Sequence, residues 1–159
     1  MNEVYCIPNV LSEEQRIKLI EDSKPLLLTS EEICKATGAN GYFPGKQTLS
    51  FLHENPKFYD IFNIFLGKIT DQLSVRFDID RAWINFTDGD KSCELWHNHI
   101  GAIYSVVYYA TAYNCGTQFE NQFVETEINS MLIFPSDLMH TAPVSNVRYD
   151  RYVLAMDLI

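Results

Sequence analysis

The sequence predicts a mainly β domain, a sandwich or barrel of short strands, with supporting helices in its N-terminal half. Up to about residue 76, apolar residues recur with helical spacing. From Phe77 onward the chain changes to short segments rich in β-branched and aromatic residues, separated by Gly, Asn, Asp, Pro and Ser. Helices followed by many short strands are typical of a sheet covered on one face. The 159 residues suit one domain, so we expect a single unit over 1–159, with helical support over about 1–76 and a barrel core over about 77–159.

Two helices are expected in the first half. Ser12 is a good N-cap and Gln15, three residues later, completes a capping box. Pro25 ends or kinks this helix. Pro56 opens the second helix, whose thick apolar stripe over 59–73 predicts packing against a sheet.

About six to eight short strands are expected after the helices, each bounded by turn residues. The predicted strands are Arg81–Phe86, Leu95–His99, Ile103–Tyr109, Gln118–Phe123, Ser130–Phe134 and Arg151–Leu158.

Composition excludes several classes of function. The formal net charge of −9 argues against nucleic acid and against an anionic membrane as partners. The four cysteines are far apart and form neither a zinc-finger spacing nor a disulfide framework. The acidic start does not resemble a signal peptide, and no apolar run approaches a membrane span. We therefore expect a cytoplasmic protein.

The histidines are the first candidates for chemistry. His97 and His99 are two positions apart in a predicted strand, so both imidazoles should point to one spot, with Asn98 turned away. His140 follows a buried-looking strand and a turn. Imidazole is a common ligand of iron, copper, nickel and zinc. Taken alone, the His-x-His pair fits two hydrogen-bonded or solvent-facing side chains equally well.

Arg151 opens an otherwise apolar strand and therefore needs a partner. Its planar guanidinium suits a carboxylate, which it can bind with two parallel hydrogen bonds. The alternative is a rim arginine in a surface salt bridge. Arg148 competes for the same role, but its neighbours Tyr149 and Asp150 are more typical of a loop.

The order of these residues resembles a known family. His-x-His is followed by the Tyr-rich segment 104–109, by Ile-Phe-Pro-Ser before His140, and by a strand that Arg151 opens. This order is similar to that of the 2-oxoglutarate/Fe(II)-dependent dioxygenases, near their small phage and bacterial and prolyl-hydroxylase-like members. The resemblance covers roughly 82–159, and the segment from Phe134 to Arg151 is its most specific part.

The resemblance implies a double-stranded β-helix, which is a cupin-like jelly roll, and a hydroxylase with Fe(II) and 2-oxoglutarate as cofactors. His97 matches the first iron ligand, His140 matches the distal histidine, and Arg151 matches the arginine that binds the distal carboxylate of 2-oxoglutarate. No catalytic residue is expected beyond the metal centre. The other candidates for co-substrate contacts are Tyr108, Tyr109 and Asn85.

One residue departs from the family pattern. The second ligand position is His99 and not Asp or Glu, whereas the usual facial triad is two histidines and one carboxylate. His99 could be a third imidazole ligand, as in some cupins, or water could take its place. Glu120 could supply a carboxylate across the barrel, whereas Glu94 has the wrong strand parity.

Three functions therefore compete. They are a 2-oxoglutarate-dependent oxygenase, a three-histidine cupin-type metal enzyme that uses no 2-oxoglutarate, and a non-catalytic binding module. Arg151 separates the first two, and metal uptake separates both from the third. A small molecule or a peptide is the expected substrate, and the oligomeric state stays open, with a homodimer as one option.

The mouth of the site is expected in the irregular stretch 30–46 and the following segment 47–51. Tyr42 and Phe43 could contact substrate there or simply pack within the loop. His53 is interpreted as a structural or surface residue.

Overall fold

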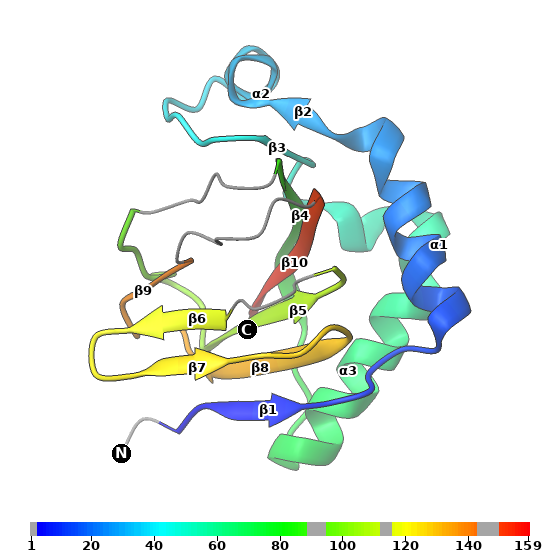
Figure 1. The fold of residues 1–159 in the computed structure, drawn as a ribbon, viewed down its shortest axis with the longest axis vertical. Helices are drawn as coiled ribbons and strands as arrows, with labels where there is room; N and C mark the ends of the chain where they lie inside the picture. Colours follow the sequence, from blue (N-terminus) through cyan, green and yellow to red (C-terminus); the bar gives the residue numbers. More distant parts are fainter. Residues whose placement is uncertain (1–2, 89–94, 112–115, 143–149) are drawn as a thin grey trace.

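The computed structural model describes residues 3–88, 95–111, 116–142 and 150–159, which form two antiparallel sheets and a layer of helices (Figure 1). The large sheet has the strand order β1-β8-β5-β10-β4-β3-β2 and the small sheet the order β7-β6-β9. The strands are β1 (Tyr5–Ile7), β2 (Leu28–Thr29), β3 (Lys46–Gln47), β4 (Ile79–Asp88), β5 (Tyr104–Tyr109), β6 (Gly116–Phe119), β7 (Phe123–Glu125), β8 (Ser130–Pro135), β9 (His140–Thr141) and β10 (Asp150–Leu158). The helices are α1 (Glu13–Ser23), α2 (Ser30–Thr37) and α3 (Tyr59–Leu73), with short 3-10 turns η1 (Lys24–Leu26), η2 (Leu52–Glu54) and η3 (Pro56–Phe58).

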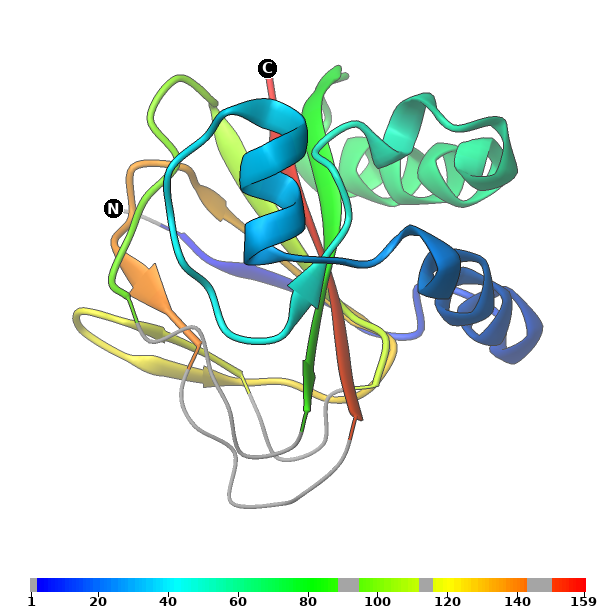
Figure 2. The ribbon, with the colours of Figure 1, turned by 90° about the horizontal axis from the view of Figure 1, so that it is seen from above.

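The elements are arranged in layers. Helices α1 and α3 lie on one side of the large sheet and the small sheet lies on the other, as the two perpendicular views show (Figures 1 and 2). The prediction of a mainly β domain with supporting helices in its N-terminal half is confirmed.

Strand β10 is the central strand of the large sheet and pairs with β4 on one side and β5 on the other. Since side chains alternate along a strand, these three strands have two distinct faces. Their even-numbered residues belong to the main hydrophobic core, together with α1 and α3: Ala82, Ile84, Val106, Tyr108, Tyr152, Leu154, Met156 and Leu158. Their odd-numbered residues line a cavity that residues of β6 and β9 also border: Arg81, Trp83, Asn85, Thr87, Ser105, Val107, Tyr109, Arg151, Val153 and Ala155.

The first helix begins and ends as the sequence predicts. Ser12 Oγ accepts a hydrogen bond from Gln15 N at 3.1 Å, and Gln15 Oε1 accepts one from Ser12 N at 2.9 Å, so the capping box is present. Helix α1 ends at Ser23, and the chain continues through Pro25 as the 3-10 turn η1.

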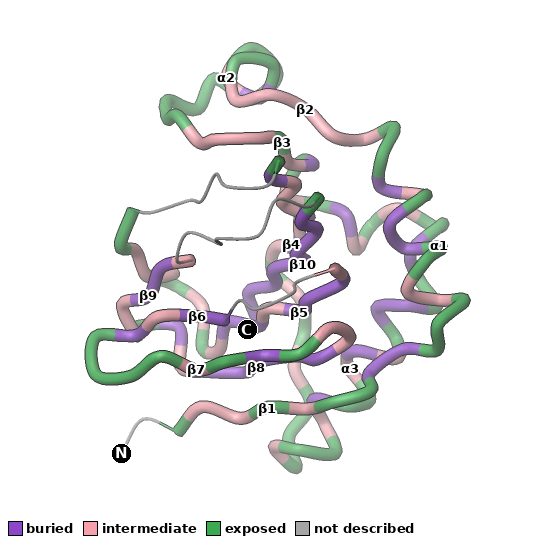
Figure 3. Tube along the Cα trace, in the orientation of Figure 1, coloured by how far each residue is buried: buried purple, intermediate pink, exposed green. Residues whose placement is uncertain are grey.

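Helix α3 packs its apolar stripe onto the sheet, which confirms that prediction. The buried residues Ile61, Phe62, Phe65 and Ile69 join the main core. The ring of Phe65 lies 4.9 Å from that of Tyr108 on β5. Figure 3 shows buried residues concentrated along β8 and β10, with exposed residues on the outer turns of α1.

Three sequence expectations are wrong. The stretch 30–46 contains helix α2, which Thr29 caps in a second capping box and which is followed by the C-cap residue Gly38 with φ +72°. The segment 95–99 is not a strand and has a single bridge, His97 to His140. The predicted strand 118–123 is a hairpin of β6 and β7. The cap at Thr29 accounts for the first difference, and the turn between β6 and β7 accounts for the third.

No helix among the described residues is both long and apolar enough to cross a membrane.

Asn129, in the turn before β8, connects this turn to the start of α1. Its side chain accepts a hydrogen bond from Leu11 N at 3.0 Å and donates one to Leu11 O at 2.8 Å. It also accepts one from Tyr108 Oη at 2.7 Å. Its φ is +64°, a region that asparagine tolerates better than most residues.

Replacing Asn129 by Ala should therefore lower the free energy of unfolding by about 3 kcal/mol, from three lost hydrogen bonds and backbone strain. Urea unfolding measures this change. Asn63→Ala, at an exposed position of α3, is the matched control and should change stability by no more than about 0.5 kcal/mol. Equal effects of the two substitutions would contradict the structural role of Asn129.

Candidate metal centre

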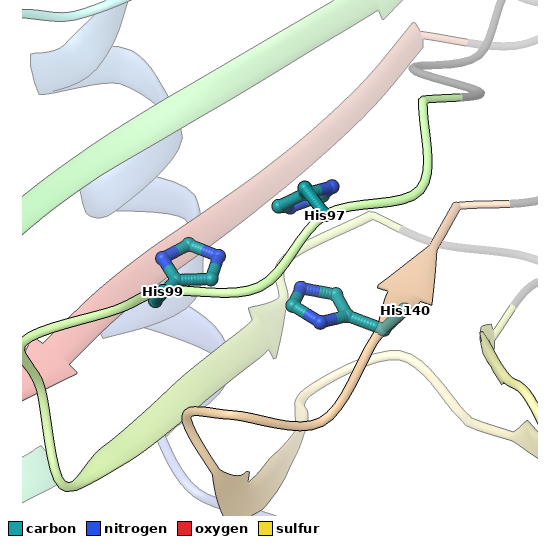
Figure 4. Close-up of side chains that lie close together, drawn as sticks. All are labelled: His97, His99 and His140. Atoms are coloured by element: carbon teal, nitrogen blue, oxygen red, sulfur yellow. The ribbon is translucent and has the colours of Figure 1, made fainter.

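Three histidines from two separate segments meet at the cavity (Figure 4). His97 and His99 lie on the segment before β5, and His140 begins β9. Their candidate ligand nitrogens all lie within 4.8 Å of one another. The ring centroid of His97 lies 4.3 Å from that of His140 and 5.1 Å from that of His99, and those of His99 and His140 are 5.2 Å apart. Within the described ranges, no other group of histidine, cysteine and acidic side chains meets this criterion.

Main-chain hydrogen bonds hold the two segments together. His97 N donates to His140 O at 3.1 Å, and His140 N donates to His97 O at 2.9 Å. His99 N donates to Ser136 O at 2.8 Å. The backbone of each histidine is therefore bonded to a partner far away in the sequence, and the two-residue spacing turns His97 and His99 to the same side without a continuous strand.

Each imidazole uses one nitrogen for a contact within the protein. Nδ1 of His97 lies 2.9 Å from the carbonyl oxygen of Leu95, and Nδ1 of His140 lies 2.9 Å from that of Leu138. A carbonyl only accepts, so these Nδ1 atoms carry the hydrogen. Nδ1 of His99 lies 2.8 Å from Oδ1 of Asp157. This arrangement leaves Nε2 of each ring as the candidate ligand atom.

Burial keeps two of these rings in the neutral form. Burial lowers the pKa of His140 to about 4, and the hydrogen bond to the Leu138 carbonyl opposes this shift only in part. Burial also lowers the pKa of His97. Near pH 7 both imidazoles are therefore neutral, and the neutral ring is the form that binds a metal.

The histidines border a cavity of about 490 Å³ that is also lined by a buried arginine. Arg151 is 9% exposed, and its Nε has no hydrogen-bond partner among the described residues. Thr87, directly opposite Arg151 on β4, is 4% exposed, and its Oγ1 also has no partner in the part of the chain that the structure describes. Buried polar atoms are normally paired, so these two donors indicate a place for an acceptor, such as a carboxylate, that enters the cavity.

Because side chains alternate along β5, only one of the tyrosines 108 and 109 can line the cavity. Asn85 lines the cavity as expected. Tyr108 does not: it is fully buried in the core on the helix side, where its hydroxyl donates to Asn129. The expectation that Tyr108 contacts a co-substrate is therefore corrected. Its neighbour Tyr109 lines the cavity and its hydroxyl is hydrogen-bonded to Thr117.

The position of Glu120 does not support it as a replacement for His99. Glu120 is exposed in the turn after β6 and is not among the residues that line the cavity. Glu94 lies outside the described residues, and so does Arg148, the competitor of Arg151. His53 packs edge-on against Phe62 at 6.2 Å, away from the three histidines, in agreement with a structural role.

Only part of the segment predicted to form the mouth of the site lines the cavity. Phe43 lines the cavity, whereas Tyr42 is 81% exposed and is not among the lining residues.

Sequence reasoning missed Asp157. It lies in β10 and is completely buried, in contact with His99, Arg81 and Ser105. The available signal was a carboxylate in an otherwise apolar strand, at the same strand parity as Arg151.

Comparisons with known proteins show which solved structures share this fold. No family profile and no curated protein sequence matches the chain. Solved structures do match it. HygX from Streptomyces hygroscopicus, with nickel and 2-oxoglutarate bound, is 10% identical with a TM-score of 0.69, over 99% of this chain and 82% of HygX. The α-ketoglutarate-dependent epimerase SnoN of nogalamycin biosynthesis is 6% identical with a TM-score of 0.72, over 99% of this chain and 78% of SnoN.

A third neighbour is a prolyl hydroxylase from Trichoplax adhaerens, in complex with a hypoxia-inducible-factor peptide. It is 14% identical with a TM-score of 0.66, over 100% of this chain and 84% of the hydroxylase. The chain therefore has the double-stranded β-helix fold of the 2-oxoglutarate/Fe(II)-dependent oxygenases, and the resemblance read from the sequence is confirmed for the fold.

Trp83 offers a direct readout of metal binding, because its ring stacks on His99 with centroids 5.8 Å apart and an interplanar angle of 17°. We expect one equivalent of Co(II) or Ni(II) to quench tryptophan fluorescence. His97→Ala removes a candidate ligand and should weaken binding by more than about 100-fold, which exceeds the loss typical when a ligand loses its hydrogen-bond partner.

His53→Ala is the matched control and should bind metal like the unaltered chain. Trp83→Phe should reduce the amplitude of quenching, since only Trp96 remains. Equal metal affinities of His97→Ala and His53→Ala would contradict this assignment of the cluster.

Proposed function

We propose that the protein is an Fe(II)- and 2-oxoglutarate-dependent oxygenase. The single observation that carries the proposal is one cavity that contains both a cluster of three histidines and a buried arginine with an unpaired Nε. A metal site alone would fit many enzymes, and a buried arginine alone would fit any acidic ligand. Both together suit a co-substrate that has a metal-chelating end and a distal carboxylate.

The histidine cluster fits Fe(II). His97, His99 and His140 each present one nitrogen, and imidazole is a ligand that iron accepts. Three protein ligands leave other positions open for a co-substrate and O₂. The metal, when bound with 2-oxoglutarate, supplies the oxidative chemistry of this class, in which the co-substrate is decarboxylated and a substrate C–H bond is oxidised.

Arg151 and Thr87 fit the distal carboxylate of 2-oxoglutarate. They lie on neighbouring strands at paired positions, and their unpaired buried atoms would both donate to carboxylate oxygens. Val153, two residues after Arg151, gives the cavity an apolar wall between this end and the metal end. Asn85, paired with Val153, and Tyr109 supply further polar groups along the same face.

The substrate would enter at the side that Phe43 and Leu95 border. We propose a small molecule or a peptide, as the known neighbours include a HygX structure with hygromycin B and the hydroxylase–peptide complex. The net charge of −9 disfavours nucleic acid. Hydroxylation is the proposed reaction, although the same fold also serves the epimerase SnoN.

One observation favours a second candidate function. Among the described residues, the cluster consists of three imidazoles without a carboxylate, which also suits a cupin-type metal enzyme without 2-oxoglutarate. In that case Arg151 would bind an acidic group of the substrate itself. The two functions differ in whether 2-oxoglutarate binds.

Anaerobic titration of the Fe(II)-loaded protein with 2-oxoglutarate tests the proposal, through the weak visible charge-transfer absorption of the complex. Arg151→Met should weaken 2-oxoglutarate binding about 100-fold, because it leaves a carboxylate without its charged partner. Fe(II) binding should not change. After exposure to air, the unaltered protein should release succinate.

Arg76→Met, at an exposed position, is the matched control and should leave 2-oxoglutarate binding unchanged. If Fe(II) binds but no absorption band and no succinate appear, the cupin-type function is favoured. If Fe(II) itself does not bind, both enzyme functions are wrong and the fold serves as a binding module.

A further inference from the structure

The environment of His99 differs from that of the other two histidines. His97 and His140 each have a main-chain carbonyl at Nδ1, whereas His99 has a carboxylate, that of Asp157 at 2.8 Å. Asp157 is 0% exposed. Burying a carboxylate is costly unless it has partners, and the His99 ring is one of the partners of Asp157.

The register of the large sheet determines the position of the Asp157 carboxylate. It is paired with Arg81 on β4 and with Ser105 on β5, its two cross-strand neighbours. Arg81 Nη2 donates to Oδ2 at 2.7 Å, and Ser105 Oγ donates to Oδ1 at 3.3 Å. The carboxylate is therefore oriented by both flanking strands, and Oδ1 is directed to the His99 ring.

The His99 ring is fixed on its faces as well. It stacks on Trp83 at an interplanar angle of 17° and on His140 at 13°. With the faces stacked and Nδ1 against Asp157, the position of Nε2 is determined by its surroundings.

The charges of Arg81 and Asp157 do not act equally on the histidine cluster. The Arg81 side chain is 44% exposed, so water screens its positive charge, whereas the Asp157 side chain is fully buried. The negative charge of Asp157 is therefore the one that acts most strongly on the histidine cluster.

We propose that Asp157 is a positioning residue of the metal centre: it holds His99 with the proton on Nδ1 and Nε2 toward the metal, and supplies from behind the ring the negative charge that a carboxylate ligand would supply directly. This inference rests on the proposed function, that the cluster holds Fe(II). It explains how histidine can occupy the second position of the motif while the site keeps one nearby carboxylate.

The test compares Fe(II) and Co(II) affinity in two variants under anaerobic conditions. Asp157→Asn keeps the shape and removes the charge, and it should bind metal 10- to 100-fold more weakly, the range typical when a ligand loses its partner. Arg81→Gln removes the opposite charge from the same network and should bind metal at least as tightly as the unaltered chain. A purely structural role of the network would weaken binding in both variants alike and would overturn the inference.

The outcomes separate this inference from the proposed function. If the unaltered protein binds metal and Asp157→Asn binds it equally well, the inference is wrong and the proposed function stands. If the unaltered protein binds no metal, both are wrong.

A measurement on the unaltered chain keeps the inference testable if Asp157→Asn does not fold. Nitrogen-15 NMR of the Zn(II)-loaded protein should show His99 bound through Nε2 and protonated at Nδ1. That proton should resonate further downfield than the Nδ1 protons of His97 and His140, because its acceptor is charged. A His99 ring that is not metal-bound, or is bound through Nδ1, would overturn the inference.

Discussion

The two-residue alternation of side chains along β10 is the constraint on which the rest of the structure depends. This strand is central in the large sheet, so each of its residues faces either the helices or the cavity. Leu154 and Met156 belong to the core that α1 and α3 complete, whereas Arg151 and Val153 line the cavity. A slip of one residue would exchange the two sets and would bury the wrong face. The register of β10 therefore determines both which residues form the core and which residues line the cavity.

The candidate metal centre is held by hydrogen bonds between two segments and by contacts of each ring with its own segment. The paired hydrogen bonds between His97 and His140 join two segments that have little regular structure of their own. The carbonyls of Leu95 and Leu138, each two residues before its histidine, fix the ring orientations. The site is therefore built at the edge of the small sheet but receives its charged groups from the large sheet.

Much of this organisation could be predicted from the sequence. The capping box at Ser12, the apolar stripe of α3 and the apolar strand 151–158 are local patterns, and the structure follows them. The spacing of His97 and His99 and the motif around His140 predicted three side chains that the structure does bring close together. Helix α2 was missed because the glycines after it outweighed its own cap at Thr29. Tyr108 was misplaced and Asp157 was missed for a shared reason: which face of a strand is buried depends on the partner strands, and pairing over such distances in sequence is not a local property.

The central position of β10 also has a consequence for how the chain folds. Both neighbours of this strand come much earlier in the sequence, and Trp83, for example, pairs with Ala155. Pairings of such long range fold slowly. Until the segment 150–158 is available, β4 and β5 have no common partner and expose unpaired edges that can associate with other chains. During synthesis the sheet therefore closes only when β10 becomes available, and the same event brings Arg151 and Asp157 to the site.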